Sequence, residues 1–180
     1  MTPQEVRNMR LKNDYKEMCN IRGPLISWQV IQGTPPYVEA YRLTVNVRSI
    51  IGPGPNYRDQ HIIDVVMPAD YPNAPPKLTM VSEPLVFHPN WWPPPRRYWC
   101  HGSWDFSEGL GYHVIRMVRT LQYDAVITNE ASPANSAAND WYQRHQNEGL
   151  FPCDRQMLPD PSKPKFEIQP VIRKKFEVRQ

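Results

Sequence analysis

Alternation of apolar and polar residues predicts four strands in the first half of the chain. In the clearest case, Leu43 and Val45 alternate with Arg42 and Thr44. Such period-two alternation is typical of a strand with one face against a core. The four predicted strands are residues 25–32, 38–50, 60–67 and 77–82. Because the connections between them are short, we expect an antiparallel meander with one buried face.

A helix is predicted before these strands, over residues 2–20. It begins with Thr2, Pro3 and Glu5, the residues of a capping box. Its loose apolar stripe consists of Val6, Met9, Leu11, Tyr15 and Met18. Its basic residues are Arg7, Arg10, Lys12 and Lys16. These basic residues form either a solvated helix face or a docking surface, and the sequence leaves both interpretations open.

Two further helices are predicted after the strands. Residues 110–122 follow the i, i+3, i+4, i+7 spacing of an amphipathic helix. Its stripe consists of Val114, Met117, Val118 and Leu121, and His113 and Arg116 lie off it. Another helix begins at the expected N-cap Ser136 and ends near Gly149. The predicted fold class is therefore α+β, with an N-terminal helix, a four-stranded antiparallel meander and C-terminal helices.

The length of 180 residues predicts one folded domain, which we place at residues 1–149. Residues 150–180 are rich in proline and charge, so we expect a tail with one short strand. This tail either folds back on the domain or binds a partner. The net charge of +3 is too small to indicate a nucleic-acid partner. We also expect no membrane partner, because there is no long apolar run and no signal peptide.

The candidate chemistry lies in a loop at residues 88–104. Its prolines exclude a helix or a central strand, and its four tryptophans are too apolar for a solvated connector. Near its end is Cys100, with basic residues close in sequence that favour the nucleophilic thiolate, namely Arg96, Arg97 and His101. Asn90 precedes Cys100 by ten residues. Its amide is a candidate donor to the negative charge that develops in acyl transfer.

The other two cysteines, Cys19 and Cys153, are far from Cys100 in sequence. Three widely spaced cysteines do not form a disulfide framework. We therefore expect a reducing compartment, the cytoplasm.

The order of these motifs resembles that of the ubiquitin-conjugating enzyme family. The proline-rich corner at residues 71–76 has the family pattern Tyr-Pro-x-x-Pro-Pro. His88-Pro89-Asn90 matches the triplet ahead of the family's active-site cysteine, here Cys100. Residues 130–138 resemble the family's loop into its next helix. The resemblance covers roughly residues 2–147.

The resemblance implies thioester chemistry. Cys100 would accept the C-terminal glycine of a ubiquitin-like protein from an activating enzyme and pass it to an amine on a protein substrate. Asn90 would support the oxyanion or the loop that carries it, and His88 would hold that loop through hydrogen bonds. Such a site needs little acid–base machinery, because a thioester is already activated toward amines. We expect no cofactor and no metal.

Departures from the family pattern assign supporting roles to other residues. The interval from His88 to Cys100 is two residues longer than in usual members. Aromatic Trp99 and His101 flank the cysteine, and Tyr98 precedes them. Ser132 stands where many members carry an acid that helps to deprotonate the incoming lysine. We therefore group Ser132, His101 and Tyr98 as supporting or gating residues.

Such divergence resembles the ubiquitin-conjugating-like proteins of bacterial operons. Their partners include activating-enzyme-like proteins and a deconjugating metalloprotease. For this chain the likeness implies a bacterial origin and a role in antiviral defence.

Three alternatives stay open on the sequence. The first is a non-catalytic variant that binds ubiquitin-like proteins, although such variants lack the cysteine. The second is a hydrolase that uses Cys100 with His101 or His113, for which no orienting acid is evident. The third is a zinc site of His88, Cys100, His101 and His113, whose spacing matches no structural zinc pattern.

Overall fold

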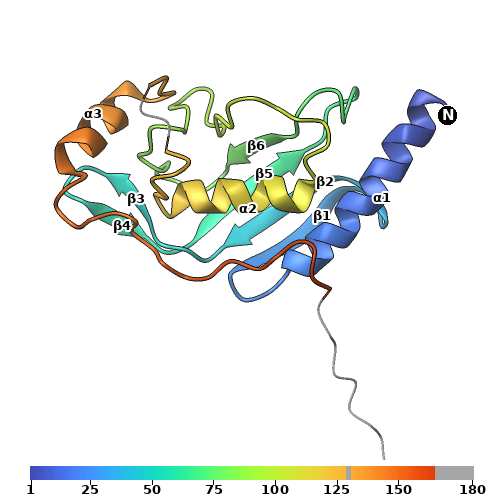
Figure 1. Ribbon diagram of the computed structural model, residues 1–180, viewed down its shortest axis with the longest axis horizontal. Coiled ribbons are helices and arrows are strands. Elements are labelled where there is room, and N and C mark those ends of the chain that lie inside the picture. The colour runs from blue at the N-terminus through green and yellow to red at the C-terminus, as the bar shows by residue number, and fades with distance from the viewer. Residues whose placement is uncertain (129–130, 165–180) are drawn as a thin grey trace, which may run out of the picture.

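A computed structural model describes residues 1–128 and 131–164 of the chain. Its main sheet is antiparallel, in the order β1-β2-β5-β6. These strands are β1 (Ile26–Thr34), β2 (Tyr37–Val45), β5 (His61–Val66) and β6 (Lys77–Met80). A helix precedes the sheet and two helices follow it, α1 (Pro3–Ile21), α2 (Leu110–Leu121) and α3 (Ser136–His145). The predicted α+β class and the four-stranded meander are confirmed (Figure 1).

The inner strand β2 shows why the alternating pattern forms a sheet. Tyr41 and Leu43 point into the core and have no exposed surface. Arg42 lies on the opposite face, where it pairs with Asp64 of β5 through two hydrogen bonds of 2.7 and 2.8 Å. The two residues are direct cross-strand neighbours, as the ladder register requires.

The prediction of one strand over residues 38–50 was wrong. Strand β2 ends at Val45, and β3 (Ser49–Gly52) pairs instead with β4 (Asn56–Arg58) in a separate two-stranded sheet. The glycine- and proline-rich turn between β3 and β4 folds residues 56–58 back onto β3. Because of this turn, β3 pairs with β4, and β2 does not continue further along β5.

Helix α2 packs on one face of the main sheet (Figure 1). The predicted stripe is correct, because Val114, Met117, Val118 and Leu121 are fully buried. The placement of His113 off this stripe was wrong, since its side chain is also fully buried. The loop before α2 covers that side of the helix, which widens the buried face beyond the apolar stripe.

Helix α1 has the predicted capping box, in which Thr2 Oγ1 accepts from the Glu5 amide and Glu5 accepts from the Thr2 amide. The predicted stripe is wrong near the start, where Val6 and Met9 are exposed. The buried face begins later and comprises Leu11, Asp14, Met18 and Ile21. The reason is tertiary, because only the second half of the helix lies against the sheet and α2.

Two carboxylates of α1 bind the first amides of α2. Asp14 Oδ1 accepts from the Leu110 amide at 2.9 Å, and Glu17 Oε2 accepts from the Gly111 amide at 2.9 Å. Gly109, the N-cap of α2, has no side chain that could do this. Carboxylates are favourable at a helix N-terminus because the amides there lack intrahelical acceptors. This contact fixes α2, and with it the loop that precedes α2.

Helix α3 closes the other end of the sheet. Its N-cap is Asn135 and not the predicted Ser136, since Asn135 Oδ1 accepts from the Ala138 amide at 3.1 Å. Tyr123, Trp141 and Tyr142 of this region form a second buried cluster with Ile50. No helix in the described parts of the chain is both long and apolar enough to cross a membrane.

Residues 150–164 run from α3 along α2 to the C-terminal end of α1 (Figure 1). The Cys153 amide donates to the Gln122 carbonyl at 3.0 Å, and Asn20 Nδ2 donates to the Pro161 carbonyl at 2.7 Å. This stretch, which we name the strap, therefore folds back on the domain. The boundary at residue 149 stays a prediction, and residues 165–180 with the expected strand lie outside the described residues.

Candidate active site

The loop that carries Cys100 is attached to the free edge of the sheet. The Trp99 amide donates to the Leu78 carbonyl at 2.9 Å, and the Met80 amide donates to the Arg97 carbonyl at 3.0 Å. Residues 97–99 therefore lie beside β6 as a further short strand, with Thr79 opposite Tyr98. Because an edge strand offers unpaired backbone groups, this pairing both protects β6 and places the loop.

Within the loop the chain doubles back on itself as a two-stranded ribbon, residues 90–100. The Cys100 amide donates to the Asn90 carbonyl at 2.8 Å, and the Trp92 amide donates to the Tyr98 carbonyl at 3.0 Å. The turn at its tip is closed by the Arg96 amide, which donates to the Pro93 carbonyl at 3.1 Å. The added loop length is thus used in a hairpin, and Asn90 comes to lie directly opposite Cys100.

The two faces of the ribbon have different surroundings. Trp91 and Trp99 oppose each other and are buried in the core, with exposed fractions of 0% and 4%. Side chains alternate along a strand, so Asn90, Cys100 and Tyr98 project from the other face. Directly opposite residues have Cβ atoms roughly 5 Å apart on the same face. The ribbon therefore places Asn90 and Cys100 opposite each other on one face, and both residues line one hollow.

His88 holds the first turn of this loop. Its Nδ1 accepts from the Asn90 amide at 2.9 Å, and its ring packs on Tyr123 with centroids 4.2 Å apart. Complete burial lowers the pKa of His88 to about 3, so the ring is neutral. Nδ1 is an acceptor, and Nε2 therefore carries the hydrogen. Hydrogen bonding by His88 to the loop agrees with the role that the resemblance implies.

A second loop, residues 131–135, is anchored to the same turn. The Pro89 carbonyl accepts from the amides of Ala134 and Asn135 at 2.8 and 3.1 Å. Ser132 lies on the exposed side of this loop. Glu130, which belongs to the same motif, is outside the described residues.

The Asn90 side chain also has a contact on the other side of the site. Its Nδ2 donates to the Ile127 carbonyl at 3.3 Å. The side-chain amide therefore holds the segment around Ile127. The oxyanion role and the bracing role of Asn90 both stay predictions.

Cys100 is partly exposed and lines a hollow of about 230 Å³. Other lining residues are Asn90, His101, Arg116 and Ile127. Arg116 and Ile127 were not among the predicted site residues. The arginine's position off the apolar stripe of α2 was a signal, whereas nothing in the sequence marked Ile127.

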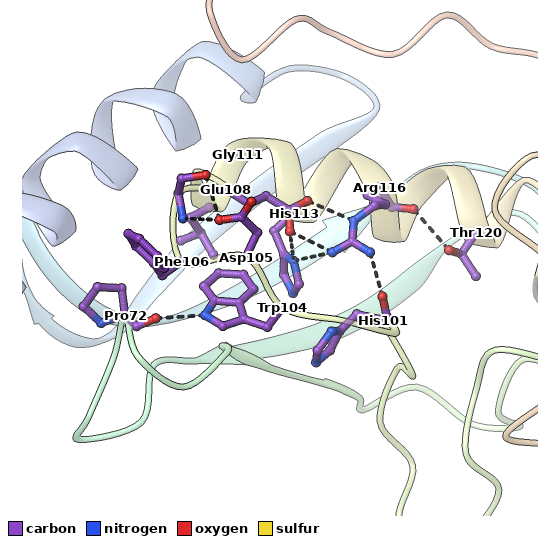
Figure 2. Close-up of polar contacts among 12 residues, drawn as sticks. Pro72, His101, Trp104, Asp105, Phe106, Glu108, Gly111, His113, Arg116 and Thr120 are labelled. Carbon is purple, nitrogen blue, oxygen red and sulfur yellow. Dashed lines mark hydrogen bonds and ion pairs between the residues drawn. The ribbon is translucent and has the colours of Figure 1, made fainter. Parts of the chain in front are cut away.

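Arg116 holds the chain on both sides of Cys100. Its guanidinium donates to the His101 carbonyl at 2.6 Å and lies over the Trp99 ring at 5.1 Å. Figure 2 shows Arg116 reaching from α2 to His101 and to Glu108. Glu108 accepts two hydrogen bonds from Arg116, of 2.9 and 2.7 Å, which balance the charge of the guanidinium. The backbone after the cysteine is thereby fixed to α2.

Glu108 also contacts His113, whose Nδ1 lies 3.1 Å from Glu108 Oε2. Burial would raise the pKa of Glu108, but the hydrogen bonds from His113 and Arg116 outweigh it and lower this pKa to about 2. Burial lowers the pKa of His113, and Glu108 opposes that effect. The hydrolase alternative thus has an orienting acid that the sequence did not reveal. His113, however, is not among the residues that line the hollow around Cys100.

The two arginines that precede Cys100 in sequence have contacts elsewhere. Arg96 stacks over Trp92 at 4.4 Å, and Arg97 forms an ion pair with Glu83 at 2.6 Å. Burial lowers the pKa of His101, so its ring is neutral at pH 7. The sequence predicted that these three residues favour the thiolate form of Cys100, and this stays a prediction.

Tyr98 lies on a neighbouring surface. It lines a hollow of about 290 Å³ together with Pro75, Lys77 and His101. Lys77 Nζ lies over its ring at 5.0 Å. His101 lines both hollows, so the two are adjacent.

Comparison with known proteins gives one likeness of fold. No protein-family model and no curated protein matches the chain. Among the solved structures that match is human ubiquitin-conjugating enzyme E2 G1. This chain is similar to it with 18% identity and a TM-score of 0.48, over 67% of this chain and 97% of that chain. The likeness concerns the arrangement of helices and strands alone.

Proposed function

We propose that this protein is a ubiquitin-conjugating-like transferase, which carries a ubiquitin-like protein as a thioester on Cys100. It then passes the acyl group to an amine of a protein substrate. The observation that carries this proposal is the ribbon of residues 90–100, in which Asn90 and Cys100 are opposite neighbours on one face. A thiol with an amide beside it, in a hollow open to solvent, suits acyl transfer between proteins.

The chemistry assigns a task to each of these groups. The amine nitrogen attacks the thioester carbonyl carbon, the carbon–sulfur bond breaks, and Cys100 leaves as thiolate. Negative charge grows on the carbonyl oxygen during attack, and the Asn90 amide stabilises it. His88 fixes the backbone of Asn90. Ser132, His101 and Tyr98 surround the approach to Cys100 as supporting groups.

The partners follow from this reaction. They are a ubiquitin-like protein, an activating enzyme that charges Cys100, and a protein substrate. A deconjugating metalloprotease that reverses the modification is the fourth. We place the reaction in the cytoplasm of a bacterium, within antiviral defence.

The non-catalytic binding variant is the main alternative, and it makes no use of the thiol. The hydrolase alternative draws on the Glu108–His113 pair. It is less well supported, because its base needs to reach the Cys100 sulfur and His113 does not line that hollow. Transfer and hydrolysis would both use Cys100 and Asn90. They differ in what accepts the acyl group, which is an amine in transfer and water in hydrolysis.

The test is thioester formation with the cognate activating enzyme and ubiquitin-like protein, in the presence of ATP. The wild-type protein should form an adduct that dithiothreitol removes. Cys100→Ser should form a thiol-resistant ester at most, and Cys100→Ala should form no adduct. Cys19→Ala is the matched control, since Cys19 is exposed on α1, and it should charge like wild type. An undiminished adduct on Cys100→Ala would contradict the proposal.

A further inference from the structure

Three side chains next to Cys100 form a row from the hollow into the protein. His101 lines the hollow, and its ring centroid lies 5.3 Å from that of His113. His113 Nδ1 lies 3.1 Å from Glu108 Oε2. Figure 2 shows these side chains on the side of α2 that faces the loop after Cys100. The row thus begins at solvent and ends at a carboxylate.

Two nitrogens in this row are buried without a hydrogen-bond partner among the described residues, His101 Nδ1 and His113 Nε2. Buried polar atoms are ordinarily paired, so unpaired ones point to a functional use. His113 Nδ1 lies 3.1 Å from Glu108 Oε2 and 3.3 Å from Arg116 Nη2. The shorter contact, with the carboxylate, places the hydrogen on Nδ1 and leaves a lone pair on Nε2. Burial lowers the pKa of both imidazoles, so both are neutral proton acceptors.

We propose that His101 is the general base that removes the proton from the attacking amine, with His113 and Glu108 as positioning residues behind it. The proposal rests on the transferase function above and adds its acid–base step. Of the described residues that line the hollow, only His101 can take up a proton at neutral pH while Cys100 is acylated. A base for the amine does not need to reach the sulfur of its sequence neighbour, and so the adjacency of His101 to Cys100 is no obstacle.

The proton and the electron pair both pass to the enzyme in this step. The amine nitrogen forms a bond to the carbonyl carbon and gives a proton to His101 as its own positive charge develops. The carbon–sulfur bond then breaks, and the electron pair goes to Cys100. The imidazolium gives its proton to solvent water and the thiolate takes one from solvent, which restores neutral His101 and the thiol. The products are an amide and the free enzyme.

The charges around His101 come from three elements. The Ser103 backbone and the Glu108 carboxylate of the following loop favour its protonated form, and Arg116 of α2 disfavours it. Lys77 of β6 lines a hollow together with His101. Uncharged His113 faces it from α2. The Ser103 backbone and the charge of Glu108 therefore stabilise the transient imidazolium.

The experiment uses the full chain and a small acyl probe, the glycylglycine thioester of 2-mercaptoethanesulfonate. A Cys19→Ser protein accepts the acyl group on Cys100, and a Cys100→Ser protein accepts it on exposed Cys19. Burial raises the pKa of Cys153 to about 12, so its thiol stays unreactive. Intact mass spectrometry then follows transfer of the acyl group to free lysine or to hydroxylamine, a weakly basic amine that loses its proton to water during attack without a catalytic base.

The base role predicts different results for the two amines. His101→Gln should slow transfer from Cys100 to lysine by about 10²-fold or more, the usual contribution of general base catalysis. The same variant should transfer to hydroxylamine at nearly the original rate. Added imidazole should restore part of the lysine reaction. His145→Gln on α3, a matched change outside the site, should leave both rates unchanged.

The pH profile tests the residues behind His101. In the Cys100-acylated protein, transfer to lysine should fall as pH drops through the pKa of His101. Glu108→Gln removes the charge that favours the imidazolium, so this fall should move to lower pH. A purely structural role of Glu108 would lower the rate at every pH without moving the profile.

Other results would overturn the proposal. Unchanged lysine transfer in His101→Gln would show that His101 is not the base, while leaving Cys100 as the acyl carrier. Equal losses with lysine and hydroxylamine would show that His101 only shapes the hollow. Transfer from Cys100 no faster than from Cys19 would overturn the transferase function and the base together.

Discussion

Asn90 has two contacts whose consequences differ. Its backbone carbonyl accepts from the Cys100 amide across the ribbon, and its side-chain amide donates to the Ile127 carbonyl. If it stabilises the oxyanion, Asn90→Ala should charge with the activating enzyme but discharge to lysine about 10²–10³-fold more slowly. Its melting temperature should stay near that of wild type. If it mainly braces the loop, charging, discharge and stability should fall together.

Single-turnover discharge and a thermal melt of the same variant separate these outcomes. Asn13→Ala, at an exposed position of α1, is the control for loss of an amide. Discharge of Asn90→Ala at the wild-type rate would leave Asn90 with neither role. We favour the oxyanion role, because His88 and the pairing with β6 already hold the loop.

The buried histidines make stability depend on pH. Burial lowers the pKa of His88 to about 3 and that of His61 to about 4, from the ordinary value of 6.5. Below pH 6.5 the unfolded chain takes up protons that the folded chain does not. The free energy of unfolding therefore decreases as the pH is lowered. From one unit above 6.5 to one unit below, each histidine should contribute a loss of about 1.4 kcal/mol.

Urea denaturation across this pH window measures the loss. A His61→Gln variant should show a shallower fall than wild type, whatever its stability at the upper pH. A free energy of unfolding that stayed constant across the window would mean that these imidazoles protonate within the fold.

At the scale of elements, the approach of α1 to α2 sets the position of the Cys100 loop. Gly111 lies where a Cβ atom would come within 2.7 Å of Glu17 Cβ and 3.0 Å of Pro161 Cβ. Alanine is favoured over glycine in an isolated helix by about 1 kcal/mol. Here the overpacking should prevail, and Gly111→Ala should destabilise the protein by about 1–3 kcal/mol.

Chemical denaturation tests this prediction, with Tyr112→Ala as the control at the adjacent, partly exposed position. A Gly111→Ala protein more stable than wild type would show that the helices separate easily. The loop after Cys100 is tied to α2 by Arg116. Displacement of α2 in this variant should therefore also slow transfer from Cys100.

At the scale of the whole molecule, the strap joins α3 to α1. Phe151 packs on Tyr123, Trp141 and Tyr142, with ring centroids 4.9, 5.8 and 4.7 Å away. A chain that ends at Gly149 loses these contacts. Phe151 is partly buried, so we expect a loss of about 1–3 kcal/mol of stability, less than the cost of removing a fully buried phenylalanine. A chain that ends at Pro164 keeps them and should unfold like the full-length protein.

Urea denaturation of both shortened chains locates the end of the domain. Equal stability of the chain ending at Gly149 would confirm the boundary predicted from the sequence. The contacts of residues 150–164 instead favour a boundary after Pro164. The proline content of this segment gave no sign of its docking, because proline-rich segments occur both in tails and in packed connections.

Local patterns determined much of this protein. Alternating residues placed all four strands of the meander, since the two faces of a strand have period two. The capping box at Thr2 and the stripe of α2 depend on residues within one or two turns, and both were correct. The triplet His88-Pro89-Asn90 and Cys100 identified the candidate site through their order and spacing.

Tertiary structure decided what depends on distant partners. The exposure of Val6, the end of β2 at Val45 and the burial of His113 each depend on which remote segment covers that surface. The same holds for the site, where pairing of residues 97–99 with β6 fixes the loop that carries Cys100. Arg116 and Glu108 join it only because α2 packs beside that ribbon. Backbone pairing and helix packing between residues far apart in sequence leave no periodic signal in the chain, so only the fold could show them.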